Sequence, residues 1–277
     1  LDELIDAGYD VKKANYFNGS EKSNSYITTY KNHCASTTAG GPEPVSPGMR
    51  IDLGQGAYIE ILASNGALDK VGDLGIDPDE ENDLSIALLV KYGNFEYVWA
   101  GDLGWVIENP LAILATLIEG SPLPPTEGVD VLAISHHGSE SSTGCAWMNL
   151  LKPEVALISV GDGQGGSYNH PRINVVDGIL LAGNPCVTVD PALVLQTEEG
   201  NPVGDNTSFS GFAVGDIVIK TDGEETYSIS GSGAVTQGPD ERLAAGLPLT
   251  VDVDWKPRYN LYFAQFGNGS GVKSVSY

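Results

Sequence analysis

Apolar and polar residues alternate in short blocks along the chain, and most of these blocks predict β-strands. Strands at 49–64 flank a glycine-containing turn at 54–56, and strands at 84–102 flank a second turn at 92–94, which predicts two hairpins. From about residue 111, segments with helical spacing alternate with apolar runs of strand length. The pattern therefore predicts hairpins followed by strand–helix units, an α/β (α+β) chain.

The remaining elements follow from the same pattern and from Gly and Pro punctuation. The first part is expected to hold a helix at 1–5, a strand at 9–17, and a polar loop or short helix within 18–48. The later part is expected to hold helices at 111–120, 145–153 and 173–183, and strands at 129–135, 154–160, 185–190, 215–230, 249–255 and 260–266. A change to Gly-, Ser- and Pro-rich sequence divides the chain into a domain at 1–232 and a β-rich extension or tail at 233–277.

Charge narrows the classes of partner. The sequence has 37 acidic and 14 basic side chains, a formal net charge of −23, so it lacks the positive field that gathers nucleic acid. No apolar run reaches the 18 residues of a membrane span. The acidity is typical of a soluble protein and favours an extracellular or periplasmic setting over others, although the sequence leaves the compartment open. The three cysteines, Cys34, Cys145 and Cys186, have no zinc-site spacing and allow one disulfide or none.

The sequence has only four histidines, and two of them, His136 and His137, stand together directly after an apolar strand. Asp102 ends the apolar segment "FEYVWAGD", and His170 follows a third strand in "SYNHP". Ends of adjacent parallel strands meet at one edge of a sheet, so these side chains are expected to lie together. Carboxylate oxygen and imidazole nitrogen suit a borderline metal ion.

Each of these residues also has a purely structural interpretation. Asp102 after a glycine is often a turn residue or a helix N-cap. His136 and His137 would alternate faces on a strand, so one of them could be buried for packing. His170 before a proline could be a hydrogen-bonded loop residue, and His33 has no comparable context and is interpreted as a surface residue.

Three segments resemble the metallo-β-lactamase fold, and within it the hydrolase domain of the ComEC/Rec2 competence proteins. They are "WAGDLG" at 99–104, "VDVLAISHHGSESS" at 129–142 and "ISVGDGQGGSYNHP" at 158–171. "NDLSIALLVKYG", which contains Asn82 and Ser85, and "GDIVIKTDGEETYSIS" are also similar to that branch. The resemblance covers about residues 1–232 and implies an αββα sandwich and a metal-dependent hydrolase.

The resemblance also implies a role for each candidate residue. Asp102 would be a metal-binding carboxylate, and His136 or His137, with His136 preferred, a metal-binding imidazole. Asp102, His137 and His170 would take part in catalysis, with His170 holding substrate or protonating a leaving group. Ser139 would orient an imidazole or a phosphate oxygen. The implied cofactor is Zn²⁺ or Mn²⁺, as one or two ions, which would activate a water molecule for attack.

One departure from the family is large. The His-x-His-x-Asp-His motif, which supplies most of the metal ligands in the family, occurs nowhere in this sequence. The chain is therefore expected to lack the N-terminal strands and this loop of the fold, either as an incomplete chain or as a diverged protein without a full site. Asp102 with one or two histidines would hold zinc only loosely.

Three functions remain open at this point. The first is a phosphodiesterase or nuclease of the ComEC-like type, which the negative charge disfavours for long polyanions. The second is a hydrolase of another ester, such as a lactone or a small phosphoester. The third is a metal-free binding domain without catalytic activity.

Overall fold

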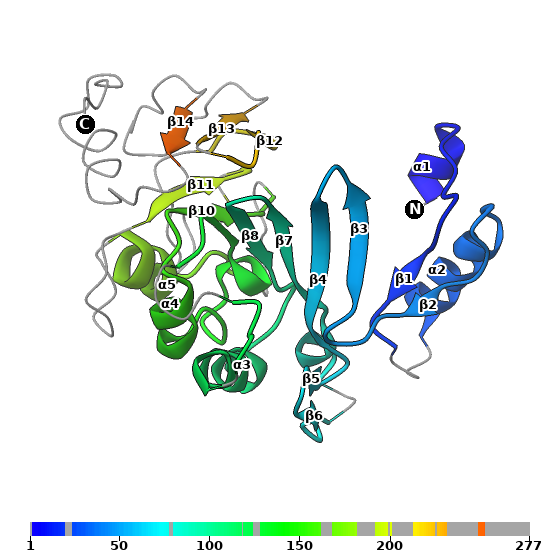
Figure 1. Ribbon diagram of the computed structural model, residues 1–277, viewed down its shortest axis with the longest axis horizontal. Helices are drawn as coiled ribbons and strands as arrows, with labels where there is room; N and C mark the ends of the chain where they lie inside the picture. The colour runs from blue at the N-terminus through cyan, green and yellow to red at the C-terminus, as the bar shows by residue number, and fades with distance from the viewer. Residues whose placement is uncertain are drawn as a thin grey trace.

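The computed structural model describes residues 2–19, 24–77, 80–117, 119–123, 128–161, 168–181, 192–198, 200, 213–224, 226–231 and 249–252. Within these ranges the protein is a mixed α and β structure, built on one nine-stranded sheet with helices against one face (Figure 1). The mixed class expected from the sequence is confirmed. The four-layer αββα arrangement stays a prediction.

The large sheet joins the two kinds of strand pairing expected from the sequence. Its order is β11-β10-β9-β8-β7-β4-β5-β6, and β3 pairs with β4. The strands are β3 (Arg50–Gly54), β4 (Ala57–Ser64), β5 (Ala67–Leu68), β6 (Gly72–Asp73), β7 (Ala87–Tyr92), β8 (Phe95–Trp99), β9 (Val131–Ala133), β10 (Val155–Ile158) and β11 (Leu193–Gln196). Strands β3, β4, β7 and β8 form antiparallel pairs, whereas β8 to β11 are parallel, so their carboxyl ends share one edge.

Helices connect the parallel strands and cover the sheet. They are α3 (Trp105–Leu117), α4 (Cys145–Leu151) and α5 (Ile173–Val175), which continues into a π-helical turn at Val176–Leu181. Apolar side chains of these helices and of the sheet form the main core, in which Trp147, Leu89 and Ile107 are fully buried. Parallel strands need such crossovers, because a tight turn can join only antiparallel neighbours.

A second, smaller sheet covers part of the opposite face. It consists of β12 (Ile217–Thr221), β13 (Thr226–Gly231) and β14 (Leu249–Asp252), all antiparallel. Tyr227 and Ile229 of β13 pack against Val131 and Leu193 of the large sheet and form a second apolar cluster. Part of the predicted 249–255 strand is thus present and pairs with β13, while the boundary at residue 232 stays a prediction. The predicted strands at 185–190 and 260–266 lie outside the described residues.

The N-terminal segment differs most from the expectations. It holds α1 (Asp2–Asp6), α2 (Ser25–Ala35) and a small parallel pair of β1 (Tyr16–Phe17) with β2 (Glu43–Pro44), and it lies beyond the β3–β4 hairpin in Figure 1. The helix at α1 is confirmed, but the strand expected at 9–17 is limited to its last two residues. The polar stretch at 18–48 contains an eleven-residue helix, which Asn24 caps by accepting a hydrogen bond from Ile27 N–H.

Helix α3 begins at Trp105, six residues before the helix expected at 111, and it contains Pro110. Ile107 and Leu111 lie four residues apart on one helix face, and both pack in the main core. Their burial outweighs the hydrogen bond that the proline removes, which is why the helix continues through a residue that normally ends one.

Two further findings concern sequence-level expectations. Cys145 is disulfide-bonded and Cys34 is a buried free thiol, while Cys186 lies outside the described residues. None of the helices in the described part of the chain has the length and apolar character needed to cross a membrane.

The two sheets are joined at their turns. The backbone N–H of Asn94, in the β7–β8 turn, donates to Gly223 O at 2.8 Å, and its side-chain amide donates to Glu224 O at 2.9 Å. A Cβ atom on Gly93 would lie only 2.0 Å from Gly223 O, and the φ of Gly93 is +58°. Gly93 is therefore required both for its backbone conformation and for the close approach of the turns.

We expect Gly93→Ala to lower the free energy of unfolding by about 3 kcal/mol, because it adds a steric clash to a left-handed backbone. Gly56→Ala is the matched control, since Gly56 has a φ of +86° but nothing within 4 Å of the added Cβ. It should cost only about 1 kcal/mol. Urea unfolding of both variants measures the difference, and equal losses would show that the turn contact does not constrain residue 93.

Candidate active site

The structure brings all four predicted site residues together at the carboxyl ends of the parallel strands. Asp102 follows β8, and His136 and His137 follow β9. The ring centroid of His170 lies 5.4 Å from that of His136 and 6.4 Å from that of His137. The expectation that these strand ends would form one cluster is confirmed in its geometry, while the catalytic and metal-binding roles stay predictions.

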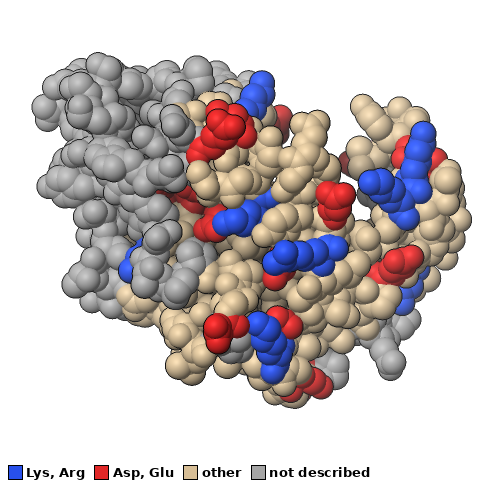
Figure 2. Space-filling model, in the orientation of Figure 1, with Lys and Arg blue, Asp and Glu red and all other residues tan. Residues whose placement is uncertain are grey.

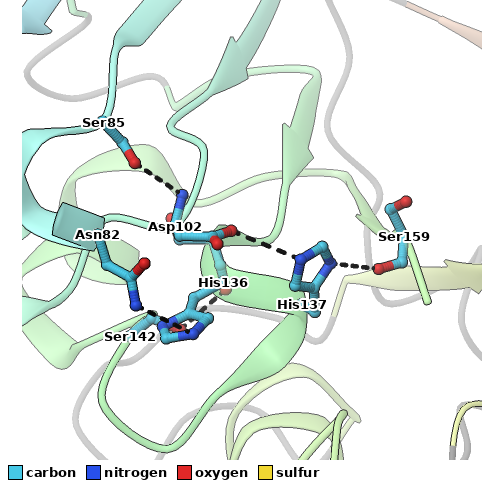
Figure 3. Close-up of polar contacts among 8 residues, drawn as sticks. Asn82, Ser85, Asp102, His136, His137, Ser142 and Ser159 are labelled. Carbon is cyan, nitrogen blue, oxygen red and sulfur yellow. Dashed lines mark hydrogen bonds and ion pairs between the residues drawn. The ribbon is translucent and has the colours of Figure 1, made fainter. Parts of the chain in front are cut away.

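The sequence suggested that the paired histidines would alternate faces on a strand, but they lie in a turn after the strand. Strand β9 ends at Ala133, and Ser135–Gly138 forms a tight turn in which His136 has φ 50°, ψ 41° and His137 has φ 54°, ψ 25°. This left-handed conformation is uncommon for residues with a side chain and costs free energy. The His136 ring lies toward Asn82, and the His137 ring lies between Asp102 and the backbone of Ser159 (Figure 3).

Hydrogen bonds from other segments hold this turn. The N–H of His136 donates to Gly101 O, and the N–H of Arg172 donates to Gly138 O, both at 2.9 Å. Gly138, with φ 77°, lies so close to Pro171 that a Cβ atom would be 2.8 Å from the proline Cβ. The turn is thus fixed from both sides, by the loop after β8 and by the segment that carries His170.

His137 and Asp102 face one another (Figure 3). Nδ1 of His137 lies 2.6 Å from the backbone oxygen of Ser159, and because a carbonyl oxygen only accepts, Nδ1 carries the proton. In the neutral ring, Nε2 then presents a lone pair, and it lies 3.6 Å from Oδ1 of Asp102. This distance is too long for a direct hydrogen bond. Both side chains are accessible, at 46% for His137 and 39% for Asp102.

The segment before β7 supports the other side of the cluster. Nδ2 of Asn82 lies 3.4 Å from Nε2 of His136, and Ser85 Oγ accepts a hydrogen bond from Asp102 N–H at 3.3 Å (Figure 3). Asp83 Oδ1 accepts from Gly104 N–H at 2.9 Å and so fixes the loop that carries Asp102. Burial lowers the pKa of His136, which favours its neutral form.

His170 is the most buried histidine of the cluster, with 7% exposure. Burial, followed by the nearby His136 and His137, lowers its pKa to about 4. Its Nδ1 atom is buried and makes no hydrogen bond within the described part of the chain. A neutral ring at pH 7 can donate or accept a hydrogen bond, but it holds no extra proton for a leaving group.

Ser139 does not contact an imidazole through its side chain. Its N–H donates to His136 O at 2.9 Å, and its hydroxyl lies 3.1 Å from Ser141 Oγ. Ser142 Oγ donates to Ser135 O at 2.8 Å and ties the two ends of the serine loop together. The serines thus shape the loop behind the histidines, and the orienting role expected of Ser139 falls to the Ser159 backbone for His137.

Glu108 is a supporting residue that the sequence analysis did not identify. It lies in α3 behind the serine loop, is fully buried, and accepts a hydrogen bond through Oε2 from Gly144 N–H at 3.1 Å. Burial raises its pKa to about 7, although the hydrogen bond from Gly144 acts in the opposite direction. An acidic residue four positions after "GDLG", on the core face of a helix, was the only available sequence signal.

Asp102 offers an oxygen and His137 a nitrogen, which are both suitable metal ligands. The distance between these two atoms also fits a shared metal ion. Two ligands held at 2.0–2.2 Å by a tetrahedral ion are roughly 3.3–3.6 Å apart. His137 Nε2 and Asp102 Oδ1 are 3.6 Å apart, with the other ring nitrogen fixed by a backbone carbonyl, as in many metal-binding histidines. In the described ranges, no group of three or more His, Cys, Asp or Glu side chains is arranged to hold an ion, so the metal-binding role of this pair stays a prediction. His137 is the histidine that faces Asp102, whereas the sequence favoured His136 as the ligand.

The chain is 28% identical over 141 residues, 51% of its length, to ComE operon protein 3 of Bacillus subtilis (strain 168). The matched region is 17% of the length of that relative. No family model matches the chain. The similarity is consistent with the ComEC/Rec2 resemblance of the sequence.

We expect Glu108 to make the stability of the fold depend on pH. In the folded protein the Glu108 carboxyl keeps its proton up to about pH 7, whereas a glutamate in the unfolded chain loses its proton near pH 4.5. The folded state therefore binds more protons than the unfolded state between these two pH values. Its contribution to the free energy of unfolding therefore falls by roughly 3 kcal/mol as the pH rises from 4.5 to 7, and is constant above. Urea unfolding at pH 5 and pH 7.5 should show this slope in the native chain and a smaller one in Glu108→Gln.

Glu140→Gln serves as the control, because Glu140 is an exposed carboxylate in the adjacent loop. It should retain the pH dependence of the native chain. An unchanged slope in Glu108→Gln would show that Glu108 is ionised throughout this range.

Proposed function

We propose that this chain is part of a metal-dependent hydrolase that cleaves a phosphodiester, of the nuclease or phosphodiesterase type known in the ComEC-like branch of the metallo-β-lactamase fold. The observation that carries the proposal is the separation of 3.6 Å between Asp102 Oδ1 and His137 Nε2, with His137 oriented by Ser159 O. The similarity to ComE operon protein 3 supports a role in competence or DNA uptake. Because the chain covers a minor part of that relative, the activity of the whole protein belongs to the proposal.

In this proposal Asp102 and His137 contribute one oxygen and one nitrogen ligand to Zn²⁺ or Mn²⁺. Such an ion supplies Lewis-acid polarisation of the scissile group and lowers the pKa of a water molecule toward 7. Asn82 holds the His136 ring in place, and His136 is available as a further ligand or as a hydrogen-bond donor to substrate. His170, neutral at pH 7, binds a substrate oxygen rather than supplying a proton.

A second candidate is a hydrolase for small phosphoesters or lactones, and the charge of the protein favours it. The net charge of −23 repels a long polyanion, and the basic side chains in Figure 2 lie apart, interleaved with acidic ones, rather than in one patch. A small ester carries little charge and meets little repulsion. The third candidate, a binding domain without metal, is an outcome of the experiment below.

We expect the full chain to bind Zn²⁺ or Mn²⁺ and to hydrolyse bis(p-nitrophenyl) phosphate in its presence. Asp102→Asn and His137→Ala should each lower the rate by about a hundredfold or more, since even residues that only orient a metal ligand contribute ten- to a hundredfold. His33→Ala is the control, because His33 lies in α2 outside the cluster, and it should retain full activity. Elemental mass spectrometry measures the bound metal, and absorbance measures the rate.

Metal uptake without hydrolysis of any ester would contradict the enzyme proposal. No metal uptake, even with excess ion, would favour the metal-free binding domain. Hydrolysis of small esters without cleavage of single-stranded or double-stranded DNA would favour the second candidate over the first.

A further inference from the structure

A cavity of about 350 Å³ opens beside Asp102 and His137. This volume lies in the range of cavities that bind small molecules. It lies where the ends of β8, β9 and β10 meet β12, so the two sheets form its walls. Besides Asp102 and His137, the wall includes the hydroxyl-bearing Tyr97, Ser159 and Thr197 and the apolar Trp99, Ala133, Leu157 and Ile217.

Two aromatic residues occupy the β8 wall of this cavity. Side chains alternate along a strand, and Val98 faces the main core, so Tyr97 and Trp99 both face the opposite side, toward the cavity. Tyr97 packs against the apolar cluster between the sheets and is held in place. Trp99 keeps 42% of its surface exposed, although it is a large apolar residue in the centre of a structured sheet. Its indole is therefore available for contact with a ligand.

The cavity has ionisable side chains at one end, and the rest of its wall is uncharged. Asp102 is the one carboxylate and His137 the one imidazole among its described lining residues, and neither Lys nor Arg is present there. The Thr197 hydroxyl accepts from Val160 N–H and donates to Val160 O, so its hydrogen bonds are already made. A ligand that fills the cavity therefore meets an uncharged, mostly apolar wall, and its polar group meets Asp102 and His137.

We propose that this cavity is a subsite for the planar, uncharged ring of the substrate, a nucleobase, which packs against Trp99 while the ester group reaches Asp102 and His137. The proposal rests on the proposed function and assigns its substrate class to esters of nucleosides. Base–aromatic stacking contributes enough to favour a ring-bearing ligand by about tenfold or more over one without a ring. The subsite recognises one ring, so it also fits a protein whose net charge opposes binding of long nucleic acids.

The test uses the full chain and two uncharged probes, adenosine and ribose, with no metal added. Saturation-transfer NMR titrations measure the affinity of both, because this method detects weak binding and shows which ligand protons touch the protein. We expect adenosine to bind at least about tenfold more tightly than ribose, with the strongest transfer to the base protons. Trp99→Ala should remove this preference, and Trp99→Phe should retain part of it.

Trp105→Ala is the matched control, because Trp105 is 46% exposed but lies on α3, on the helix-covered side of the sheet. It should keep the preference for adenosine. Ala133→Leu provides a second variant that fills the cavity and removes no aromatic ring, and it should weaken adenosine binding while thermal unfolding shows a folded protein. If Trp99→Ala does not fold, Ala133→Leu tests the subsite in its place.

Equal affinity for adenosine and ribose, or an undiminished preference in Trp99→Ala or Ala133→Leu, overturns the subsite. These binding data do not depend on turnover. Adenosine binding that depends on Trp99, in a chain that takes up metal but hydrolyses no ester, supports the subsite and overturns the proposed function. Hydrolysis without any adenosine preference overturns the subsite alone.

Discussion

The site depends on one local constraint, the left-handed backbone at residues 136–138. All three residues have positive φ, and because glycine adopts this region freely, the two histidines alone cost of order a few kcal/mol relative to ordinary backbone. The cost is offset by hydrogen bonds from three directions: Gly101 after β8, Arg172 after the segment with His170, and Ser142 within the loop itself. Because Gly101 and Arg172 lie in neighbouring strand connections, the conformation of the turn depends on the alignment of β8, β9 and β10.

The same arrangement controls the charge of the cluster. Burial lowers the pKa of both His136 and His170, and the nearby His136 and His137 lower that of His170 further, so both rings favour their neutral forms. Glu108, behind the loop, is a carboxyl group whose burial disfavours its charge. Asp102 and His137 are the accessible groups at the opening, so a cation would meet one carboxylate and neutral imidazoles rather than competing positive charges. This distribution suits the binding of a metal ion better than an ion-pair network would.

The sequence predicted the helices, strands and site residues well where the pattern was local. The hairpins β3–β4 and β7–β8, the helix α4, and the clustering of Asp102 with His136, His137 and His170 followed from periodicity and from the rule that parallel strand ends share one edge. The early start of α3 was missed because burial of Ile107 is a tertiary effect that overrides the local signal of Pro110. The conformation of the histidine turn was missed for a related reason, since no sequence pattern reports a left-handed His-His pair that is held by distant backbone groups.

The orientation of His137 depends on a backbone group and not on a neighbouring side chain. Its ring is oriented by the main-chain oxygen of Ser159, which directly follows β10, and not by a carboxylate or hydroxyl. Any residue at position 159 presents the same oxygen, as long as β10 keeps its pairing with β9. The imidazole tautomer is therefore a property of strand register. A substitution at residue 159 would therefore leave this hydrogen bond to His137 in place, whereas a one-residue slip of β10 would remove it without changing any side chain of the cluster.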